Sequence, residues 1–235
     1  MPIDTLSYKR DPLKLNSKYL LIIIMAYFVA ILSADVVAYK FVSIGGITLS
    51  GATIVFPLTY LFSDVITEVY GYNIAKKIIW LSLIGELIFS MIIKGVISLP
   101  SANFENYQNA FELTDGSMYL FVIGGIIGNI TSSFLNIYLI SKWKILLSGR
   151  LFWIRSILST AISELLIIGV AVIIGFSNRL SLHQQITVFS WAYFIEIIYA
   201  CVFVWPAWAL SLFLKKSEGI DSYDYNVNYN PFKIS

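Results

Sequence analysis

Six carboxylates interrupt stretches of this chain that are otherwise apolar, and they are its most informative residues: Asp35, Asp64, Glu68, Glu86, Glu164 and Glu196. An ionised carboxylate near the middle of a bilayer costs at least about 2.5 kcal/mol, so it is expected to face a cavity or a partner. A carboxylate also accepts charge-assisted hydrogen bonds, which are stronger than neutral ones. These residues therefore indicate a polar binding site between membrane-spanning helices.

Depth along the predicted helices separates these carboxylates. Glu164 and Glu196 each lie about 11 residues into a predicted span, which places them roughly 16 Å from opposite membrane faces. Asn129 reaches a similar depth in a third span, and Glu86 lies about 14 Å deep in another. Several helices thus present hydrogen-bonding groups at one level, close to the bilayer midplane.

Helical spacing brings further polar and aromatic groups to the same faces. Tyr60, Asp64 and Glu68 follow one another at intervals of four residues, which is one face of a helix. Three residues before Glu196, Tyr193 shares its side. The pattern predicts a polar, aromatic-edged cavity, with these substrate-binding residues: Glu164, Glu196, Asn129, Tyr60, Asp64, Glu86 and Tyr193.

Composition and hydropathy supply the elements that position these groups. The 235 residues are 58% hydrophobic and 13% charged, whereas soluble domains carry about 25% charged residues. A spanning helix needs about 20 apolar residues. We predict an all-α membrane protein with six transmembrane helices, at 19–43, 51–70, 77–98, 117–141, 153–176 and 185–213. They form one domain over 19–214, between an N-terminal tail (1–18) and a Tyr/Asn-rich C-terminal tail (215–235) that is expected to be disordered or to lie on the surface.

Basic residues predict the orientation of this bundle. With the N-terminus in the cytoplasm, thirteen of the 16 Lys and Arg residues flank the cytoplasmic side and three the other. This asymmetry agrees with the positive-inside rule for an even number of spans. We therefore expect both tails to be cytoplasmic, in a multi-pass protein of the bacterial inner membrane.

Other function classes find little support in the sequence. The net charge of +2 is too small to indicate a nucleic-acid partner. No Walker motif or H-E-x-x-H motif is present, and the one histidine, His183, is expected in a loop. We expect no enzymatic activity, no cofactor and no metal. An intramembrane hydrolase working through paired carboxylates is a minor alternative.

Some of the candidate residues also have a purely structural interpretation. Asp35 can lie in the outer leaflet and reach water, and Glu68 can pair with Lys76 or Lys77 near the cytoplasmic end. The alanines at intervals of four, Ala30, Ala34 and Ala38, are more typical of helix packing than of ligand contact.

The segment from Gly51 to Gly71 resembles the VUT family, the queuosine precursor transporters. It carries a proline-containing helix and an Asp-x-x-x-Glu-x-Tyr-Gly end at 64–71, followed by the basic pair of Ala75-Lys-Lys-Ile-Ile79. Weaker similarity continues through Gly128-Asn129, around Glu164 and through Trp205-Pro206. The resemblance covers nearly the whole chain apart from the two tails.

The resemblance implies import of 7-deazaguanine bases, such as the cyano- and aminomethyl-substituted precursors preQ0 and preQ1, for tRNA modification. Glu164 or Glu196 would then accept the ring N–H and the exocyclic amine, with Asn129 and Tyr60 orienting the base. Many family members have an aspartate at the position of Glu164 and a basic residue at that of Glu196. The second difference reverses a charge, so it leaves the exact substrate open.

One alternative from another class is the substrate-binding component of an energy-coupling-factor importer of vitamins or nucleobases. Ala30, Ala34 and Ala38 would then form the docking face for a partner module. A stand-alone transporter, in contrast, should import without one. The sequence also leaves open whether import is proton-coupled, and whether the chain forms a homo-oligomer.

Overall fold

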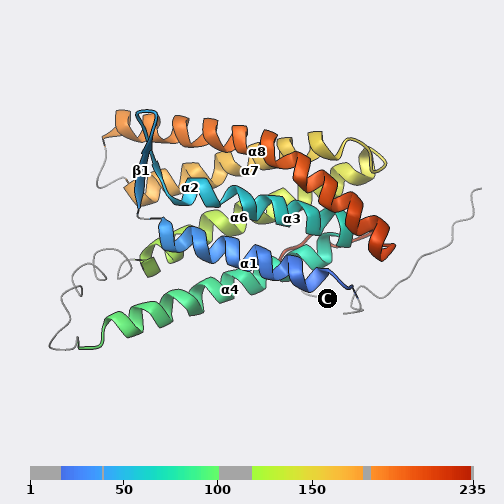
Figure 1. Cartoon of the computed structure of the whole chain (residues 1–235), viewed down its shortest axis with the longest axis horizontal. Helices are drawn as coiled ribbons and strands as arrows, with labels where there is room; N and C mark the ends of the chain where they lie inside the picture. The colour runs from blue at the N-terminus through green and yellow to red at the C-terminus, as the bar shows by residue number, and fades with distance from the viewer. Residues whose placement is uncertain (1–16, 39, 101–117, 177–180, 234–235) are drawn as a thin grey trace, which may run out of the picture.

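The computed structural model describes residues 17–38, 40–100, 118–176 and 181–233. Long helices dominate this part of the chain, with one short hairpin and one short helix between the first two (Figure 1). The elements are α1 (Leu20–Val37), β1 (Phe41–Ile44), β2 (Ile47–Ser50), α2 (Ala52–Val55), α3 (Pro57–Tyr70), α4 (Tyr72–Ile97), α6 (Met118–Leu146), α7 (Phe152–Phe176) and α8 (Leu182–Glu218).

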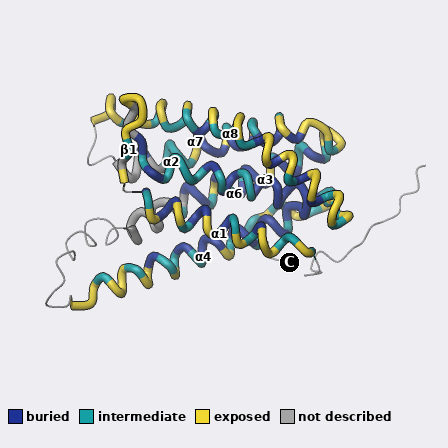
Figure 2. Tube along the Cα trace, in the orientation of Figure 1, coloured by how far each residue is buried: buried dark blue, intermediate teal, exposed yellow. Residues whose placement is uncertain are grey.

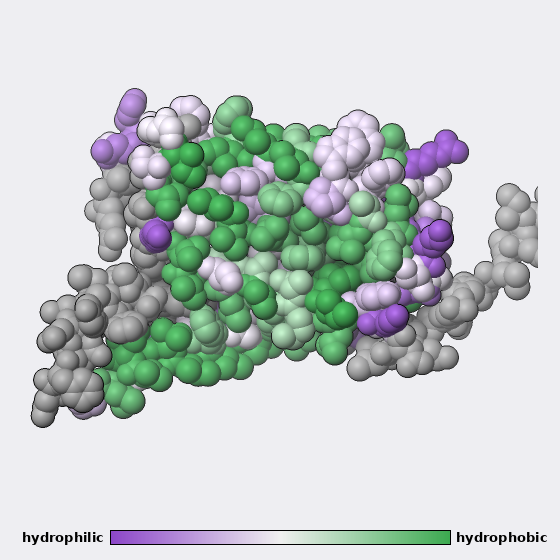
Figure 3. Space-filling model, viewed as in Figure 1, coloured by the Kyte–Doolittle hydropathy of each residue, from purple (hydrophilic) through white to green (hydrophobic). Residues whose placement is uncertain are grey.

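The described helices have the length and surface of membrane spans. Five stretches are long and apolar enough to cross a bilayer: Leu20–Val37, Ala52–Tyr70, Tyr72–Ile97, Phe152–Val170 and Leu182–Glu218. The 29-residue α6, on the fourth predicted span, lies against α4 and α7. On the face in Figure 3, apolar side chains cover the middle and hydrophilic ones gather at the two ends. The predicted all-α membrane fold is confirmed.

The first predicted span, 19–43, is too long. Helix α1 ends at Val37, and residues 41–50 form an antiparallel hairpin in which Phe41 pairs with Ser50 and Ile44 with Ile47. Gly45 and Gly46 make the turn with φ of 60° and 84°, as a tight two-residue hairpin requires. Hydropathy alone predicted a longer helix here because the strands are almost as apolar as the helix before them.

The second predicted span, 51–70, consists of two helices. The short α2 ends at Val55, and α3 begins at Pro57. Proline has no backbone N–H, so it is tolerated at the first position of a helix, where that donor has no intrahelical partner. The interruption therefore follows directly from Pro57.

The last helix, α8, is longer than the predicted 185–213. It begins with a capping box in which the side chains and backbone N–H groups of Ser181 and Gln184 bond reciprocally. This cap places His183 in the first turn of α8 and not in a loop. The helix continues through Pro206 and ends at Glu218, and the Gly219 that follows it has φ of 66°.

The start of α1 and the end of α8 meet at one end of the bundle. The backbone N–H of Tyr19 donates to Glu218 Oε1 at 2.7 Å, and the Tyr70 hydroxyl donates to Glu218 Oε2 at 2.8 Å. The hairpin lies at the opposite end (Figure 1). Buried residues face the inside of the bundle along most helices (Figure 2). The start of α1 and the end of α8 lie at the same end of the bundle, which agrees with an even number of spans.

The C-terminal tail is ordered over 219–233 and packs against the ends of α4 and α6, so the expectation of disorder is wrong. Asp224 is buried and accepts from the Tyr72 N–H at 3.0 Å and from the Ser141 hydroxyl at 2.6 Å. Trp80 Nε1 donates to the carbonyl of Pro231 at 2.8 Å. Burial raises the pKa of Asp224. The polar side chains and carbonyl groups of the tail accept hydrogen bonds from donors on α4 and α6, so its polar composition stabilises an ordered conformation.

Candidate substrate-binding site

Helices α3 and α6 are joined by polar contacts that repeat every helical turn. The hydroxyl oxygens of Tyr60 and Ser132 lie 2.5 Å apart. One turn further along both helices, Asn136 Nδ2 donates to Asp64 Oδ1 at 2.6 Å. The equal step of four residues means that the two helices run parallel here, with their polar faces in register.

Asp64 is held from a third helix as well. The Ser156 hydroxyl on α7 donates to its Oδ2, so both carboxylate oxygens accept hydrogen bonds from neighbouring helices. In this conformation Asp64 joins α3, α6 and α7. That Asp64 binds substrate stays a prediction, and its geometry gives it a structural role first.

Glu68, one turn beyond Asp64, is the centre of a buried ion cluster. Its Oε2 pairs with Arg155 Nη1 at 2.8 Å and its Oε1 with Lys215 Nζ at 2.6 Å. Lys144 Nζ lies 3.8 Å from Glu68 Oε1 and 2.5 Å from Asp221 Oδ1. The partners thus come from α6, α7 and α8, and the expected pairing with Lys76 or Lys77 is wrong.

The rest of this cluster connects it to the tail. Lys76 donates to the carbonyl of Lys233 at 2.8 Å and makes no ion pair with Glu68. Partial burial opposes the charge of Asp221, but the bonds and charges of Lys144 and Lys215 outweigh it and hold the pKa of Asp221 below its ordinary value. The tail is therefore fastened by charge as well as by hydrogen bonds.

Glu164 and Glu196 lie deep in the bundle without a basic partner. Their exposed fractions are 1% and 5%, and among the described residues every ion pair belongs to the cluster around Glu68 and Asp221. Glu164 faces the Tyr60 hydroxyl and interacts electrostatically with Glu196. Glu164 Oε1 is buried with no hydrogen-bond partner. These two carboxylates and Tyr60 form one group.

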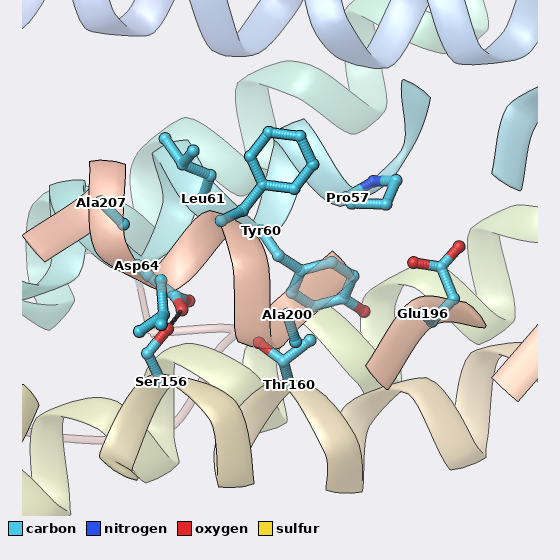
Figure 4. Close-up of a pocket in the computed structure, with 11 residues that line it drawn as sticks. Pro57, Tyr60, Leu61, Asp64, Ser156, Thr160, Glu196, Ala200 and Ala207 are labelled. Atoms are coloured by element: carbon cyan, nitrogen blue, oxygen red, sulfur yellow. Dashed lines mark hydrogen bonds between the residues drawn. The ribbon is translucent and has the colours of Figure 1, made fainter. Parts of the chain in front are cut away.

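A cavity opens beside this group, between α3, α7 and α8. Its lining includes Tyr60, Asp64, Ser156, Thr160, Glu196 and Phe203. Figure 4 shows Asp64 and Ser156 at one end and Glu196 toward the other, with Tyr60 between them. The space is about 20 Å³, which is room for about one water molecule. The bundle is therefore closed around the site.

A second, smaller cavity lies on the other side of Tyr60, toward α1 and α6. It is lined by Tyr27, Ile31, Thr59, Tyr60, Ser63, Asn129 and Ser133. Asn129 Oδ1 accepts from the Ser133 hydroxyl at 2.6 Å. Tyr60 lines both cavities, so it is the residue that connects Asn129 with the Glu164–Glu196 group.

Three predicted residues line neither cavity: Glu164, Tyr193 and Glu86. Glu164 lies beside Tyr60, which lines both. Tyr193 donates to the carbonyl of Ala161 at 3.3 Å and stacks on Phe189, which ties α8 to α7. Glu86 lines neither cavity among the described residues and lies beside Asp35 and Asn129. Unlike Glu164, which lies beside Tyr60 and Glu196, Glu86 interacts electrostatically with Asp35, so we do not propose that it contacts substrate.

Sequence reasoning left several lining residues out of the predicted site. Ser156 lies on a serine-bearing face of the fifth span, a signal that could have included it. Phe203 lies seven residues after Glu196, on the same side of its helix, which is a signal of the same kind. Thr160 carries no such signal, because one hydroxyl in an apolar helix is ordinary. The packing of α8 against α3 and α7 brings it to the cavity.

Comparison with known proteins agrees with this architecture. Residues 50–210, which include the α3–α6 contacts and both carboxylates, match the family described as "Putative vitamin uptake transporter". The chain belongs to this vitamin uptake transporter (VUT) family. A relative from Bacillus subtilis (strain 168), named "Probable queuosine precursor transporter", is 29% identical over 137 residues. That match covers 58% of this chain and 60% of the relative. No solved structure matches the chain.

Family membership and apolar helices together indicate a multi-pass membrane protein of the bacterial inner membrane. The structure does not support a docking face for a partner module on the first span. Ala30 and Ala34 of α1, and Ala38 directly after it, are buried, and α1 packs against α2 and α3. This chain uses these alanines for packing within its own bundle.

Proposed function

We propose that this VUT protein imports 7-deazaguanine bases, the queuosine precursors. The observation that carries the proposal is the Glu164–Glu196 pair, which is buried in the bundle without a basic counter-charge among the described residues. Glu196 lines the first cavity, and Glu164 lies behind it, beside Tyr60. The name of the Bacillus subtilis relative supports the same substrate class. Import of such bases serves tRNA modification.

The chemistry of a guanine-type base suits these groups. Its edge presents a ring N–H beside an exocyclic amine, and one carboxylate can accept both as charge-assisted hydrogen bonds. We assign this contact to Glu164 or Glu196. The rings of Tyr60 and Phe203 at the cavity provide apolar surfaces for the flat base, and the second carboxylate can meet the ammonium of the aminomethyl-substituted precursor.

The structure corresponds to a closed state in this proposal. A space of about 20 Å³ holds about one water molecule, so the helices around Tyr60 must separate before a base enters. Asn129, on the other side of Tyr60, would then become available as an orienting group. We propose that separation takes place between α8 and α3, because α8 covers the cavity with Glu196, Ala200 and Phe203.

Restoration of queuosine in tRNA tests the proposal. Cells that lack their own importer and cannot make the precursors would express this chain and be fed each base in turn. We expect queuosine to return with at least one 7-deazaguanine base, and with no need for a partner module from the donor organism. Failure with every precursor, despite membrane insertion of the chain, would exclude the proposed substrate class.

A further inference from the structure

A second pair of buried carboxylates lies on the far side of Tyr60, away from the Glu164–Glu196 group. Asp35 on α1 and Glu86 on α4 interact electrostatically, and their exposed fractions are 9% and 4%. Asp35 lies 15 residues after the start of α1 and Glu86 14 after that of α4, so both lie about 21 to 22 Å from the end that carries the tail. Two helices thus place one carboxylate each at the same depth.

This pair is short of hydrogen bonds as well as of counter-charge. Asp35 Oδ2 and Glu86 Oε1 are both buried with no hydrogen-bond partner. Among the described residues, neither carboxylate takes part in an ion pair. A buried carboxylate without a cation is costly to keep ionised and becomes neutral by taking up a proton. Two such groups in contact make the charged state costlier still.

The surroundings of the pair contain hydroxyls and an amide. Tyr27 of α1 interacts with Ser82 and Glu86 of α4, and α6 contributes the uncharged Asn129 as a partner of Glu86. Tyr60 of α3 faces the same side across the second cavity. The titratable neighbours among the described residues are therefore two tyrosines, and neither supplies a positive charge.

These polar groups also connect the pair with the substrate site. Asn129 lies near Glu86 and lines the second cavity, Tyr60 lines both cavities, and Tyr60 faces Glu164. The connection runs through side chains that each have alternative hydrogen-bond partners, such as Ser133 for Asn129 and Ser132 for Tyr60. Proton loading at one end can therefore change the hydrogen bonds at the other.

We propose that Asp35 and Glu86 form a proton-binding site, separate from the Glu164–Glu196 pair, that couples import of the base to inward movement of protons. The inference rests on the proposed function and adds its driving force. A proton enters with each base from the external side, is held by the carboxylate pair while the site is closed, and leaves to the cytoplasm. No other co-substrate takes part.

Purified protein in liposomes separates this inference from the proposed function. Counterflow, the exchange of labelled cyano-substituted 7-deazaguanine against the same unlabelled base inside, needs no gradient and tests transport alone. Accumulation driven by an acidic exterior tests coupling. For one proton per base, we expect wild-type protein to accumulate the base up to about tenfold per pH unit. A pH-sensitive dye in the lumen should report acidification at the same time.

The variants Glu86→Gln and Asp35→Asn should retain counterflow and lose both accumulation and acidification. Glu218→Gln, the same change at the tail end of the bundle, should behave like wild type. Counterflow without gradient-driven accumulation in wild type would overturn the inference but not the proposed function. So would accumulation driven by Na⁺ in place of protons, or full coupling in both variants. Absence of counterflow in wild type would overturn the proposed function, and the inference with it.

Discussion

The Tyr60 hydroxyl on α3 lies 2.5 Å from that of Ser132 on α6, and Tyr60 also faces Glu164 of α7. This one side chain therefore joins three helices at the level of the deep carboxylates. It also separates two cavities, one with Glu196 and one with Asn129. A residue in this position can hold the bundle closed and contact the substrate when the bundle opens.

Replacing Tyr60 by Phe tests whether the hydroxyl of Tyr60, and not only the packing of its ring, contributes to base binding. The ring stays and the hydroxyl goes, so we expect base affinity to fall about tenfold, as for the loss of one hydrogen bond of about 1 to 1.5 kcal/mol. Equilibrium binding in detergent measures the change. Ser132→Ala is the matched control, since it removes the α6 partner but leaves the hydroxyl beside Glu164. Equal losses in the two variants would mean that Tyr60 acts only through α6.

The ion cluster at the tail end predicts a large effect on stability. Glu68→Gln leaves Arg155, which is completely buried, without its carboxylate, and removing one partner of a buried pair costs about 3 to 5 kcal/mol. Thermal unfolding in detergent should show a much lower midpoint. A second change, Arg155→Met, should recover part of the loss, because the uncompensated charge is then gone.

Lys216→Met is the control for that experiment, as Lys216 is exposed and takes no part in the described ion pairs. We expect it to change the unfolding midpoint little, in line with other surface charges. An unchanged midpoint for Glu68→Gln would contradict the assignment of Glu68 to the centre of the cluster.

Gly71 predicts how tightly the tail is packed. It has φ of 86°, and a Cβ there would lie 2.8 Å from Asp224 Oδ1 and 2.9 Å from Ser222 Oγ. Gly71→Ala should therefore displace the tail and expose Tyr223 and Tyr229, which are half-buried, to chymotrypsin. Limited proteolysis followed by mass measurement detects cleavage in the tail.

Gly46→Ala controls for backbone strain in that experiment. Gly46 has φ of 84°, and a Cβ at this position would have no atom within 4 Å, so an alanine there has an unfavourable backbone conformation without a collision. We expect its tail to resist the protease as in wild type. Equal cleavage of the two variants would show that the tail contacts at Gly71 do not hold it.

The sequence predicted the polar faces of the bundle well. The four-residue spacing of Tyr60, Asp64 and Glu68 reappears as successive contacts with α6 and α7. Depth counting also brought Glu164 and Glu196 to one level, since regular helices convert residue number directly into distance. Periodicity and length are properties of a single segment, so they can be derived without an alignment.

Contacts between distant segments were beyond such reasoning. The partners of Glu68 are on α6, α7 and α8, and no spacing along α3 indicates them. The ordered tail depends on Asp224 meeting Tyr72 and Ser141, which composition alone cannot reveal. The hairpin at 41–50 was missed for a different reason, because apolar strands and apolar helices have the same hydropathy.

The most direct test asks whether Glu164 or Glu196 accepts the hydrogen bonds of the base, by comparing the affinities of bases with and without the exocyclic amine. Purified protein would be titrated with 7-deazaguanine and with the analogue that lacks the exocyclic amine. If Glu164 or Glu196 accepts both donors, removing the amine should weaken wild-type binding about 10- to 100-fold, the loss of a hydrogen bond to a charged group. In Glu164→Gln or Glu196→Gln this preference should disappear, while Glu218→Gln keeps it. Equal affinity of wild type for the two bases, or an intact preference in both carboxylate variants, would contradict the assignment of the site.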